Sequence, residues 1–290
     1  MSAQREQPGP VLGRSVAARL LAQARLSLPF YLGFGAPAVR RTYADCRVRA
    51  AAGREPELVR ELLDLYRAMA DPGAGSVETI NFRCAVITVA ESGERMFFKE
   101  FPRHHLLHDV ERMLRCSRVD RAWRAAHLLP RAGIFTPRAV GTAFVRLEDG
   151  RTMEYLATEW VDGALPYHVR LRRVSGDSEA RVALLRGFAA HLRLWHDRGV
   201  YLRDLVKNVL TRESECGLEF WLTDLDQLHP ARRLTSGRLL HQMSQFARWV
   251  GPLAEEEANA TVVSYFGDAR GRMAGIIKEV LLTTVPASPA

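Results

Sequence analysis

The hydrophobic pattern of the chain changes at Gly163, and this change is the strongest constraint on the fold. Before this position, short apolar runs of strand length alternate with turn residues. After it, most apolar residues recur at the three- and four-residue spacing of helices. The change predicts an α+β chain with two lobes, and 290 residues are enough to form both.

The first half contains two hairpin signals on either side of a helical stretch. The apolar runs 84–90 and 95–101 are joined by ESGE, and the runs 142–148 and 152–161 are joined by DGR. Residues 107–129 between the hairpins have helical spacing. We therefore expect a small, mostly antiparallel sheet with one helix packed on it.

The second half is predicted to be mainly helical, with a short β insertion. Helical spacing is clear in residues 179–197, and it returns in three segments near the end of the chain, 236–250, 253–267 and 270–283. Between them, the apolar run 218–228 is typical of a strand and ends in acidic residues. We divide the chain into a basic N-terminal segment of uncertain role, a β-rich lobe and a helical lobe, at residues 1–53, 54–162 and 163–285.

The N-terminal segment carries most of the net charge. Residues 1–50 hold eight arginines and two acids, which is +6 of the +8 of the whole chain. Three interpretations of its apolar and basic stretch remain open: contact with an anionic membrane, a packed helix, or a targeting sequence. No repeated basic motif rich in aromatic residues accompanies it, so we do not expect a nucleic-acid partner. The four cysteines have neither metal-ligand nor CxxC spacing and nothing marks a disulfide scaffold, so we expect a reducing compartment.

Lysine is rare in this chain, because only three of the 41 basic residues are lysines. Lys99 lies near the end of the apolar run MFFKEF, and Lys207 lies in the stretch YLRDLVKNVL. An ammonium group is a compact point charge, unlike the planar guanidinium of arginine. We infer that these lysines mark positions where a compact charge is needed.

Four polar residues follow the predicted elements in an informative order. Lys99 comes from the β-rich lobe, Asp204 and Asn208 follow helix 179–197, and Asp224 ends the apolar run FWLTD. A lysine can neutralise nucleotide phosphates, and carboxylate and amide oxygens are suitable ligands for Mg²⁺. A second carboxylate can accept or orient an acceptor hydroxyl. This order of residues predicts a phosphoryl-transfer site between the lobes.

Four stretches together resemble the lipopolysaccharide kinase family of the protein-kinase-like superfamily. They are FFKEF, SRVDRAWRAAHLLPRAGIFTPRAVG, HDRGVYLRDLVKNVL and FWLTDLDQL, and the resemblance spans about residues 80–265. It implies a two-lobed protein-kinase-like fold and phosphorylation of a Kdo or heptose sugar, with ATP and Mg²⁺ as cofactors. A glycolipid or sugar acceptor and a location at the cytoplasmic face of the bacterial inner membrane are implied as well.

The same resemblance assigns roles to the central residues. Lys99 would contact the nucleotide phosphates, Asp204 would be the catalytic acid, and Asn208 and Asp224 would hold the metal. We expect Arg203 to orient Asp204, because a planar guanidinium can hold a neighbouring carboxylate.

Further contacts are expected at the edge of the nucleotide site. The backbone of Glu159 and Val161 would read adenine as the hinge between the lobes, and Arg83 would contact phosphate. Asp226 stays open between a supporting acid and a turn residue. Only about a dozen residues follow Asp224 before the next helix, and this short segment favours a small-molecule or glycolipid acceptor.

The chain departs from the family pattern at three places. Asp204 and Asn208 are four residues apart instead of five, and no glycine is present in the loop around Arg83. Ala122 replaces the glutamate that pairs with the strand lysine, and Asp120 lies about 200° further around the helix. These departures support an alternative, a pseudokinase that binds nucleotide or acts as a scaffold in envelope biogenesis. An aminoglycoside-type or protein kinase is a third interpretation.

Overall fold

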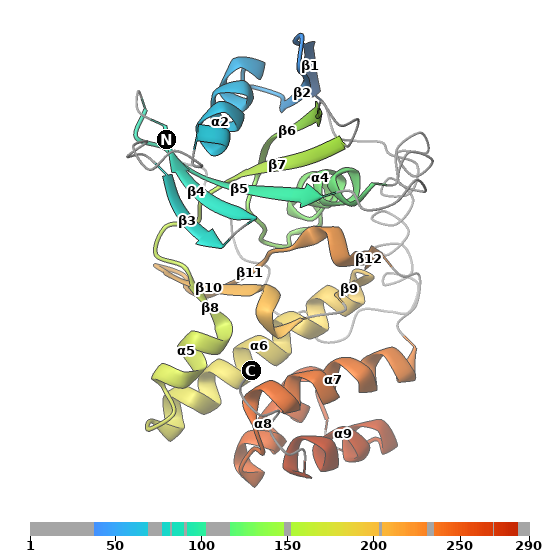
Figure 1. Ribbon diagram of the computed structural model, residues 1–290. Coiled ribbons are helices and arrows are strands. Elements are labelled where there is room, and N and C mark those ends of the chain that lie inside the picture. Colours follow the sequence, from blue (N-terminus) through green and yellow to red (C-terminus); the bar gives the residue numbers. More distant parts are fainter. Residues whose placement is uncertain are drawn as a thin grey trace.

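The computed structural model describes residues 38–68, 77–81, 83–89, 92–102, 117–147, 152–202, 205–230, 235–268 and 270–283. These residues form the two-lobed α+β architecture that the sequence predicts, with a sheet above a mainly helical part in Figure 1. None of the helices in these ranges is long and apolar enough to cross a bilayer.

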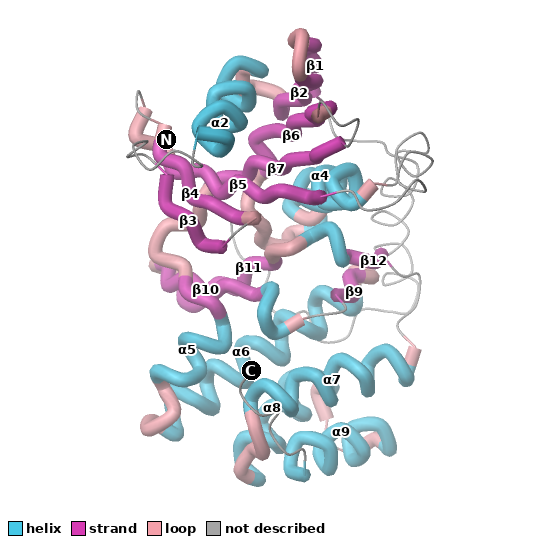
Figure 2. Tube along the Cα trace, viewed as in Figure 1, coloured by secondary structure: helices cyan, strands magenta, loops and turns pink. Residues whose placement is uncertain are grey.

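The upper lobe is built on an antiparallel sheet of seven strands, in the order β1-β2-β6-β7-β5-β4-β3. The sequence predicts four of them, as the two hairpins β4–β5 and β6–β7. Helices α2 and α4 accompany the sheet (Figure 2). The bounds are β1 Ala38–Thr42, β2 Cys46–Ala51, α2 Pro56–Ala68, β3 Val77–Asn81, β4 Cys84–Thr88, β5 Arg95–Pro102, α4 Arg118–Leu128, β6 Ala139–Arg146 and β7 Thr152–Glu159.

The two faces of this sheet belong to different hydrophobic cores. Phe98 packs in the cluster that contains the buried residues of α2, whereas Phe101 packs in the cluster of α4 and the lower lobe. Side chains alternate across a strand, so Lys99 points to the same face as Phe101, away from α2. The alternation of β5 therefore directs this lysine toward the lower lobe.

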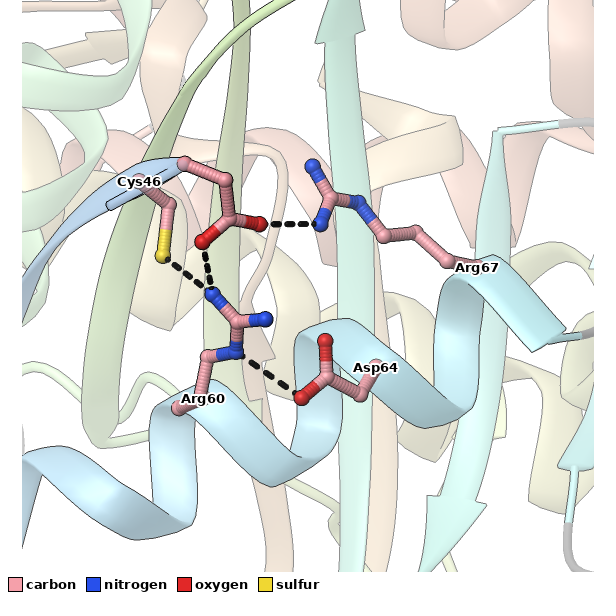
Figure 3. Close-up of polar contacts among 5 residues, drawn as sticks. Cys46, Arg60, Asp64 and Arg67 are labelled. Carbon is pink, nitrogen blue, oxygen red and sulfur yellow. Dashed lines mark hydrogen bonds and ion pairs between the residues drawn. The ribbon is translucent and has the colours of Figure 1, made fainter. Parts of the chain in front are cut away.

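Strands β1 and β2 lie at one edge of the sheet, within the segment for which the sequence gives no clear role. Ion pairs connect their turn to α2, as Figure 3 shows. Asp45 accepts hydrogen bonds from Arg60 and from Arg67, the latter at 2.8 Å, and Arg60 also binds Asp64 at 2.8 Å. These two arginines hold the pKa of Asp45 well below its usual range. The boundaries proposed for the three segments remain a prediction.

Close packing of α2 on the sheet depends on Gly141. A Cβ atom at this position would lie 2.2 Å from Val59 Cγ2 and 2.8 Å from the carbonyl oxygen of Arg49. Neither distance is compatible with a side chain. Gly141 therefore lets α2 approach β6 closely.

The lower lobe contains the remaining helices and two small sheets. Strands β11, β10 and β8 form one sheet, and β12 pairs with β9. The bounds are η1 Pro130–Ala132, β8 Leu165–Pro166, α5 Tyr167–Arg173, α6 Ser178–Asp197, β9 Val200–Leu202, η2 Val206–Asn208, β10 Val209–Ser214, β11 Gly217–Leu222, η3 Leu225–Gln227, β12 Leu228–Pro230, α7 Ser236–Val250, α8 Glu255–Phe266 and α9 Arg272–Thr283. The helices predicted for this half are confirmed as α6, α7, α8 and α9.

A buried chain of hydrogen bonds fixes the end of β9. The Tyr265 hydroxyl donates to Nδ1 of His196 at 2.6 Å, and Nε2–H of His196 donates to Oε1 of Gln242. Gln242 in turn donates its Nε2–H to the carbonyl of Leu202 at 2.6 Å. Burial lowers the pKa of His196 to about 4, and a neutral imidazole has the one N–H donor and one acceptor that these directions use. The chain of bonds joins α6, α7 and α8 to the last residue of β9.

Acidification is expected to destabilise the fold through His196. Its pKa is about 4 when folded and about 6.5 when unfolded, so the unfolded state takes up the proton first as pH falls. This stabilisation is complete above pH 6.5 and is lost toward pH 4, by about 3 kcal/mol in total. We expect the free energy of unfolding in urea to fall less steeply over this window in His196→Gln than in the wild type. An identical slope in both proteins would contradict the assignment, and His241→Gln, at an exposed position of α7, is the control.

Candidate active site between the two lobes

Lys99 reaches from the sheet to two acidic side chains of the lower lobe. Its Nζ contacts Oδ1 of Asp224 directly and lies 3.5 Å from Oδ1 of Asp226. The Lys99 and Asp224 side chains are each 21% exposed, whereas that of Asp226 is only 1% exposed. The predicted approach of Lys99 and Asp224 is therefore present in the structure.

Asp224 has an unusual backbone conformation. It follows β11 with φ 52° and ψ 47°, and it is the only residue other than glycine with positive φ in the described part of the chain. Such a conformation is uncommon for a residue with a Cβ atom, although aspartate adopts it more readily than most, and it recurs at functional sites. Its Oδ2 accepts a hydrogen bond from Nε2 of Gln227 at 2.9 Å. Backbone and side chain together hold this carboxylate toward Lys99.

Asp226 is held by arginines of α4. Nε of Arg118 donates to its Oδ2 at 2.6 Å, and Nε of Arg121 donates to its backbone carbonyl at 3.2 Å. Of the two alternatives that the sequence leaves open, these contacts favour a supporting acid. The Asp-x-Asp spacing indicates Asp226 from the sequence. Arg118 and Arg121 cannot be identified in the same way, because the chain contains many arginines and no local pattern distinguishes these two.

The two carboxyl groups have opposite pKa shifts. Burial opposes the ionisation of Asp224, but the hydrogen bond shared with Asp226 and the charge of Lys99 outweigh it and lower the pKa of Asp224. Burial and the hydrogen bond shared with Asp224 raise the pKa of Asp226. The pair therefore keeps its first negative charge on Asp224, the carboxylate nearest to Lys99 and the more exposed of the two.

Asn208 lies beside Asp224 and has an unsatisfied amide. Its backbone carbonyl accepts a hydrogen bond from Thr223 N–H at 2.8 Å, which fixes it next to the residue before Asp224. The residue is 8% exposed, and its Nδ2 has no hydrogen-bond partner among the described residues. A buried amide without a partner is costly, and a bound ligand would remove the cost.

The donor set fits a hard divalent cation. The Asp224 carboxylate and the Asn208 amide supply oxygen atoms, and a half-turn of the amide directs its oxygen to the open position. Within the described ranges, no three His, Cys, Asp or Glu residues gather as metal ligands. A metal here would thus rest on Asp224, on Asn208 and on oxygens of a bound substrate.

The connection between α4 and β6 joins the lobes directly beneath this site. The Thr136 hydroxyl donates to the carbonyl of Leu222 at 2.8 Å, and Leu222 N–H donates to the carbonyl of Phe135 at 2.9 Å. Leu222 is the last residue of β11, two positions before Asp224. The position of Asp224 is therefore tied to the connection between α4 and β6 by backbone and side chain.

Two expected site residues, Arg203 and Asp204, lie outside the described residues. The structure describes their neighbours: Leu202 ends β9, and Leu205 precedes η2. The stretch is thus flanked by the short strands β9 and β10.

The expected adenine and phosphate contacts lie around β5 and β7. The N–H of Glu159 donates to the backbone carbonyl of Arg138 at 2.9 Å, and the backbone carbonyl of Val161 accepts from the N–H of Ala164 at 3.2 Å, so these two backbone groups already have partners. The carbonyl of Arg83 accepts from the N–H of Glu100 at 2.8 Å, which places its backbone beside β5. The roles of Glu159, Val161 and Arg83 remain predictions.

Helix α4 contributes no acid to Lys99 within the described residues. Asp120 forms an ion pair with Arg49 of β2 at 2.9 Å, as expected from its position around the helix, and Ala122 is buried. Helix α4 contacts the site instead through Arg118, whose guanidinium donates to Asp226. The partner of Lys99 is therefore the Asp-x-Asp turn of the lower lobe.

Removing the charge of Lys99 should destabilise the protein. In Lys99→Met, the two neighbouring carboxyl groups lose their shared cation, and one of them is almost fully buried. We expect a loss of about 1–3 kcal/mol in the free energy of unfolding, measured in urea. Lys278→Met is the matched control, because Lys278 pairs at the surface with Glu255, whose side chain is 75% exposed. Equal losses in both variants would show that the Lys99 contact contributes no more than a surface pair.

Comparisons with known proteins identify the family of the chain. The family model described as the lipopolysaccharide kinase (Kdo/WaaP) family matches residues 77–248, which is more than half of the chain. No curated protein matches the sequence. One solved structure similar to it is that of WaaP in complex with acyl carrier protein, at 16% identity and a TM-score of 0.46, with 79% of this chain and 94% of that chain covered. This chain has a two-lobed α+β fold and belongs to the lipopolysaccharide kinase (Kdo/WaaP) family.

Proposed function

We propose that this protein is an ATP-dependent kinase that phosphorylates a sugar hydroxyl of a lipopolysaccharide core, Kdo or heptose, or of a similar glycan. The observation that carries the proposal is the contact of Lys99 with Asp224 across the lobes, beside the unsatisfied amide of Asn208. Membership of the lipopolysaccharide kinase family supports the same reaction class.

Residues from both lobes would hold the cofactors. Lys99 would exchange its contact with Asp224 for the phosphates of ATP, and Asp224 and Asn208 would then hold Mg²⁺. The bound metal would neutralise the negative charge that develops on the phosphates. Adenine would lie against the backbone of Glu159 and Val161, with Arg83 as a further phosphate contact. The raised pKa of Asp226 lets it remain a supporting group while Asp224 carries the negative charge.

Asp204 would accept or orient the proton of the acceptor hydroxyl, with Arg203 as its orienting partner. Support comes from the residues just before this pair, because Gln242 fixes the carbonyl of Leu202. A general base needs a defined position relative to the hydroxyl it serves, and a fixed carbonyl two residues away limits where Asp204 can lie.

The acceptor is proposed to be a sugar or glycolipid. Helix α7 begins at Ser236, twelve positions after Asp224, so the segment between them is short. A short segment leaves little surface to bind a peptide, whereas a sugar hydroxyl needs only the immediate surroundings of the catalytic acid. We place the protein at the inner face of a bacterial inner membrane, where such an acceptor is available from the cytoplasm.

The second candidate is a pseudokinase that binds nucleotide or acts as a scaffold. The observation that favours it is the absence of an acid from α4 at Lys99 among the described residues, with buried Ala122 at the expected position. A pseudokinase that binds nucleotide shares the nucleotide site with the kinase and differs in phosphoryl transfer, whereas a scaffold needs neither. Binding and turnover must therefore be measured separately.

Turnover separates the candidates. We expect purified protein to transfer the γ-phosphate of ATP to lipid A–core fragments, and Asp204→Ala to lower kcat by about 10²–10⁴-fold through loss of the general base. Radiolabelled product is the readout, and Asp268→Ala, at an exposed position between α8 and α9, is the matched control. Equal turnover by the wild type and Asp204→Ala would remove Asp204 from the mechanism. No transfer to any acceptor, with binding intact, would support the pseudokinase.

Nucleotide binding is expected to depend on the metal and on Asn208. Mg-ATP should raise Tm, because a ligand that binds only the folded state stabilises it. ATP with a chelator should raise Tm less, and Asn208→Leu should remove the difference between the two conditions. Thermal denaturation provides the measurement. An unchanged Tm of the wild type at millimolar Mg-ATP would exclude both the kinase and the nucleotide-binding pseudokinase.

A further inference from the structure

A cavity separate from the candidate active site opens between the edge of the sheet and α4. Its volume is about 440 Å³, and it is bounded by β1, β2, β6 and the first two turns of α4. Ligand pockets commonly have volumes of about 300–1,000 Å³. Lys99, Asp224 and Asn208 are not part of its lining. Its principal side chains are Arg40, Arg47, Arg49, Trp123, Arg124 and Phe144.

The sheet register gathers arginines on the face of this cavity. Arg40 of β1 lies directly opposite Arg49 of β2, and Arg47 is two residues from Arg49, so the three share one face. Like charges directly opposite each other destabilise a strand pair. Burial lowers the pKa of Arg49, and the charges of Arg40 and Arg124 lower it further.

The acids in the lining only partly compensate this charge. Asp120 pairs with Arg49 at 2.9 Å, and Glu154 is the other acidic residue of the cavity. Arg41, also in the lining, pairs with Glu57 of α2. Within the described ranges Arg40 makes no ion pair. Five lining arginines against two lining acids leave the cavity positively charged.

The arginine and aromatic side chains are already arranged around one another. The guanidinium of Arg47 lies 4.7 Å from the ring centre of Phe144, and that of Arg49 lies 4.5 Å from the ring centre of Trp123. Stacking restricts these flexible side chains. It leaves the N–H groups at the edge of the Arg47 guanidinium available to donate to an anion, whereas Arg49 already donates to Thr142 at 3.1 Å and to Asp120 at 2.9 Å. The ion pairs between Asp45 and α2 hold the turn that joins β1 and β2 (Figure 3). Stacking and ion pairs therefore hold the lining side chains of the cavity in fixed positions.

We propose that this cavity binds the phosphate group of a compact organic phosphate. Guanidinium groups bind phosphate through paired, charge-assisted hydrogen bonds, and the aromatic walls provide apolar surface for the carbon-bearing part of the ligand. The phosphate belongs either to a soluble molecule or to the headgroup of an anionic lipid. This site gives a role to four of the arginines that make the N-terminal part of the chain basic.

Binding of inorganic pyrophosphate, followed by calorimetry without divalent cations, tests the proposal. Arg40 and Arg47 are exposed, so Arg40→Gln/Arg47→Gln should keep the fold, which the unchanged Tm would confirm. We expect this variant to bind at least about tenfold more weakly, because each charge-assisted hydrogen bond lost weakens binding. Arg186→Gln, at an exposed position of α6, should bind as the wild type does. Lys99→Met, which removes the phosphate contact of the nucleotide site, should retain the binding that Arg40→Gln/Arg47→Gln loses.

Three results would overturn the proposal: no binding by the wild type, equal binding by the Arg40→Gln/Arg47→Gln variant, or a loss confined to Lys99→Met. The last would place the anion in the nucleotide site. Because the Lys99→Met arm is independent of the cavity, failure of this proposal is distinguishable from failure of the proposed kinase.

Vesicle sedimentation distinguishes the two sources of phosphate. Vesicles of phosphatidylcholine with phosphatidic acid should bind the wild type but not the double variant, and pyrophosphate should compete, if the phosphate belongs to a lipid. Pyrophosphate binding without vesicle binding assigns a soluble phosphate. Vesicle binding that the double variant retains, together with no effect of pyrophosphate, would contradict a site in this cavity.

Discussion

The contact between Lys99 of β5 and the Asp-x-Asp turn after β11 joins the two lobes through charge. One cation serves two carboxyl groups that would otherwise repel each other in a partly buried place. The contact defines which face of the sheet meets the lower lobe, and the alternation of β5 is what directs Lys99 to that face. Both groups can also exchange partners: Lys99 can bind an incoming anion, and Asp224 can bind a cation.

Several features of the fold are arranged so that this contact has a fixed geometry. Thr136 ties the end of β11 to the connection after α4, and Arg118 of α4 holds Asp226. Below the site, Gln242 fixes the carbonyl of Leu202. The strained backbone of Asp224 is compatible with this arrangement because neighbouring hydrogen bonds determine the turn from both sides. Helix α4 thus supports the site through an arginine rather than through an acid.

Periodicity predicted the regular elements well because their patterns are local. Helix α6 and the hairpin of β4 and β5 were evident, and the order of Lys99 and Asp224 indicated a shared site. Strands β1 and β2 were not predicted, because we interpreted the alternating arginines in CRVRA as part of a basic segment and not as one face of a sheet. The pair of Arg118 and Asp226 could not be predicted, since 108 residues separate them and only the tertiary fold brings them together.

The central claim is that Lys99 and Asp224 act on the same bound nucleotide. The most direct measurement is the Kd of Mg-ATP in a double-mutant cycle of Lys99→Met and Asp224→Asn. We predict that the two losses do not add, because each variant disturbs the same phosphates and the same metal. Losses that add fully, as they do for distant and independent positions, would contradict it.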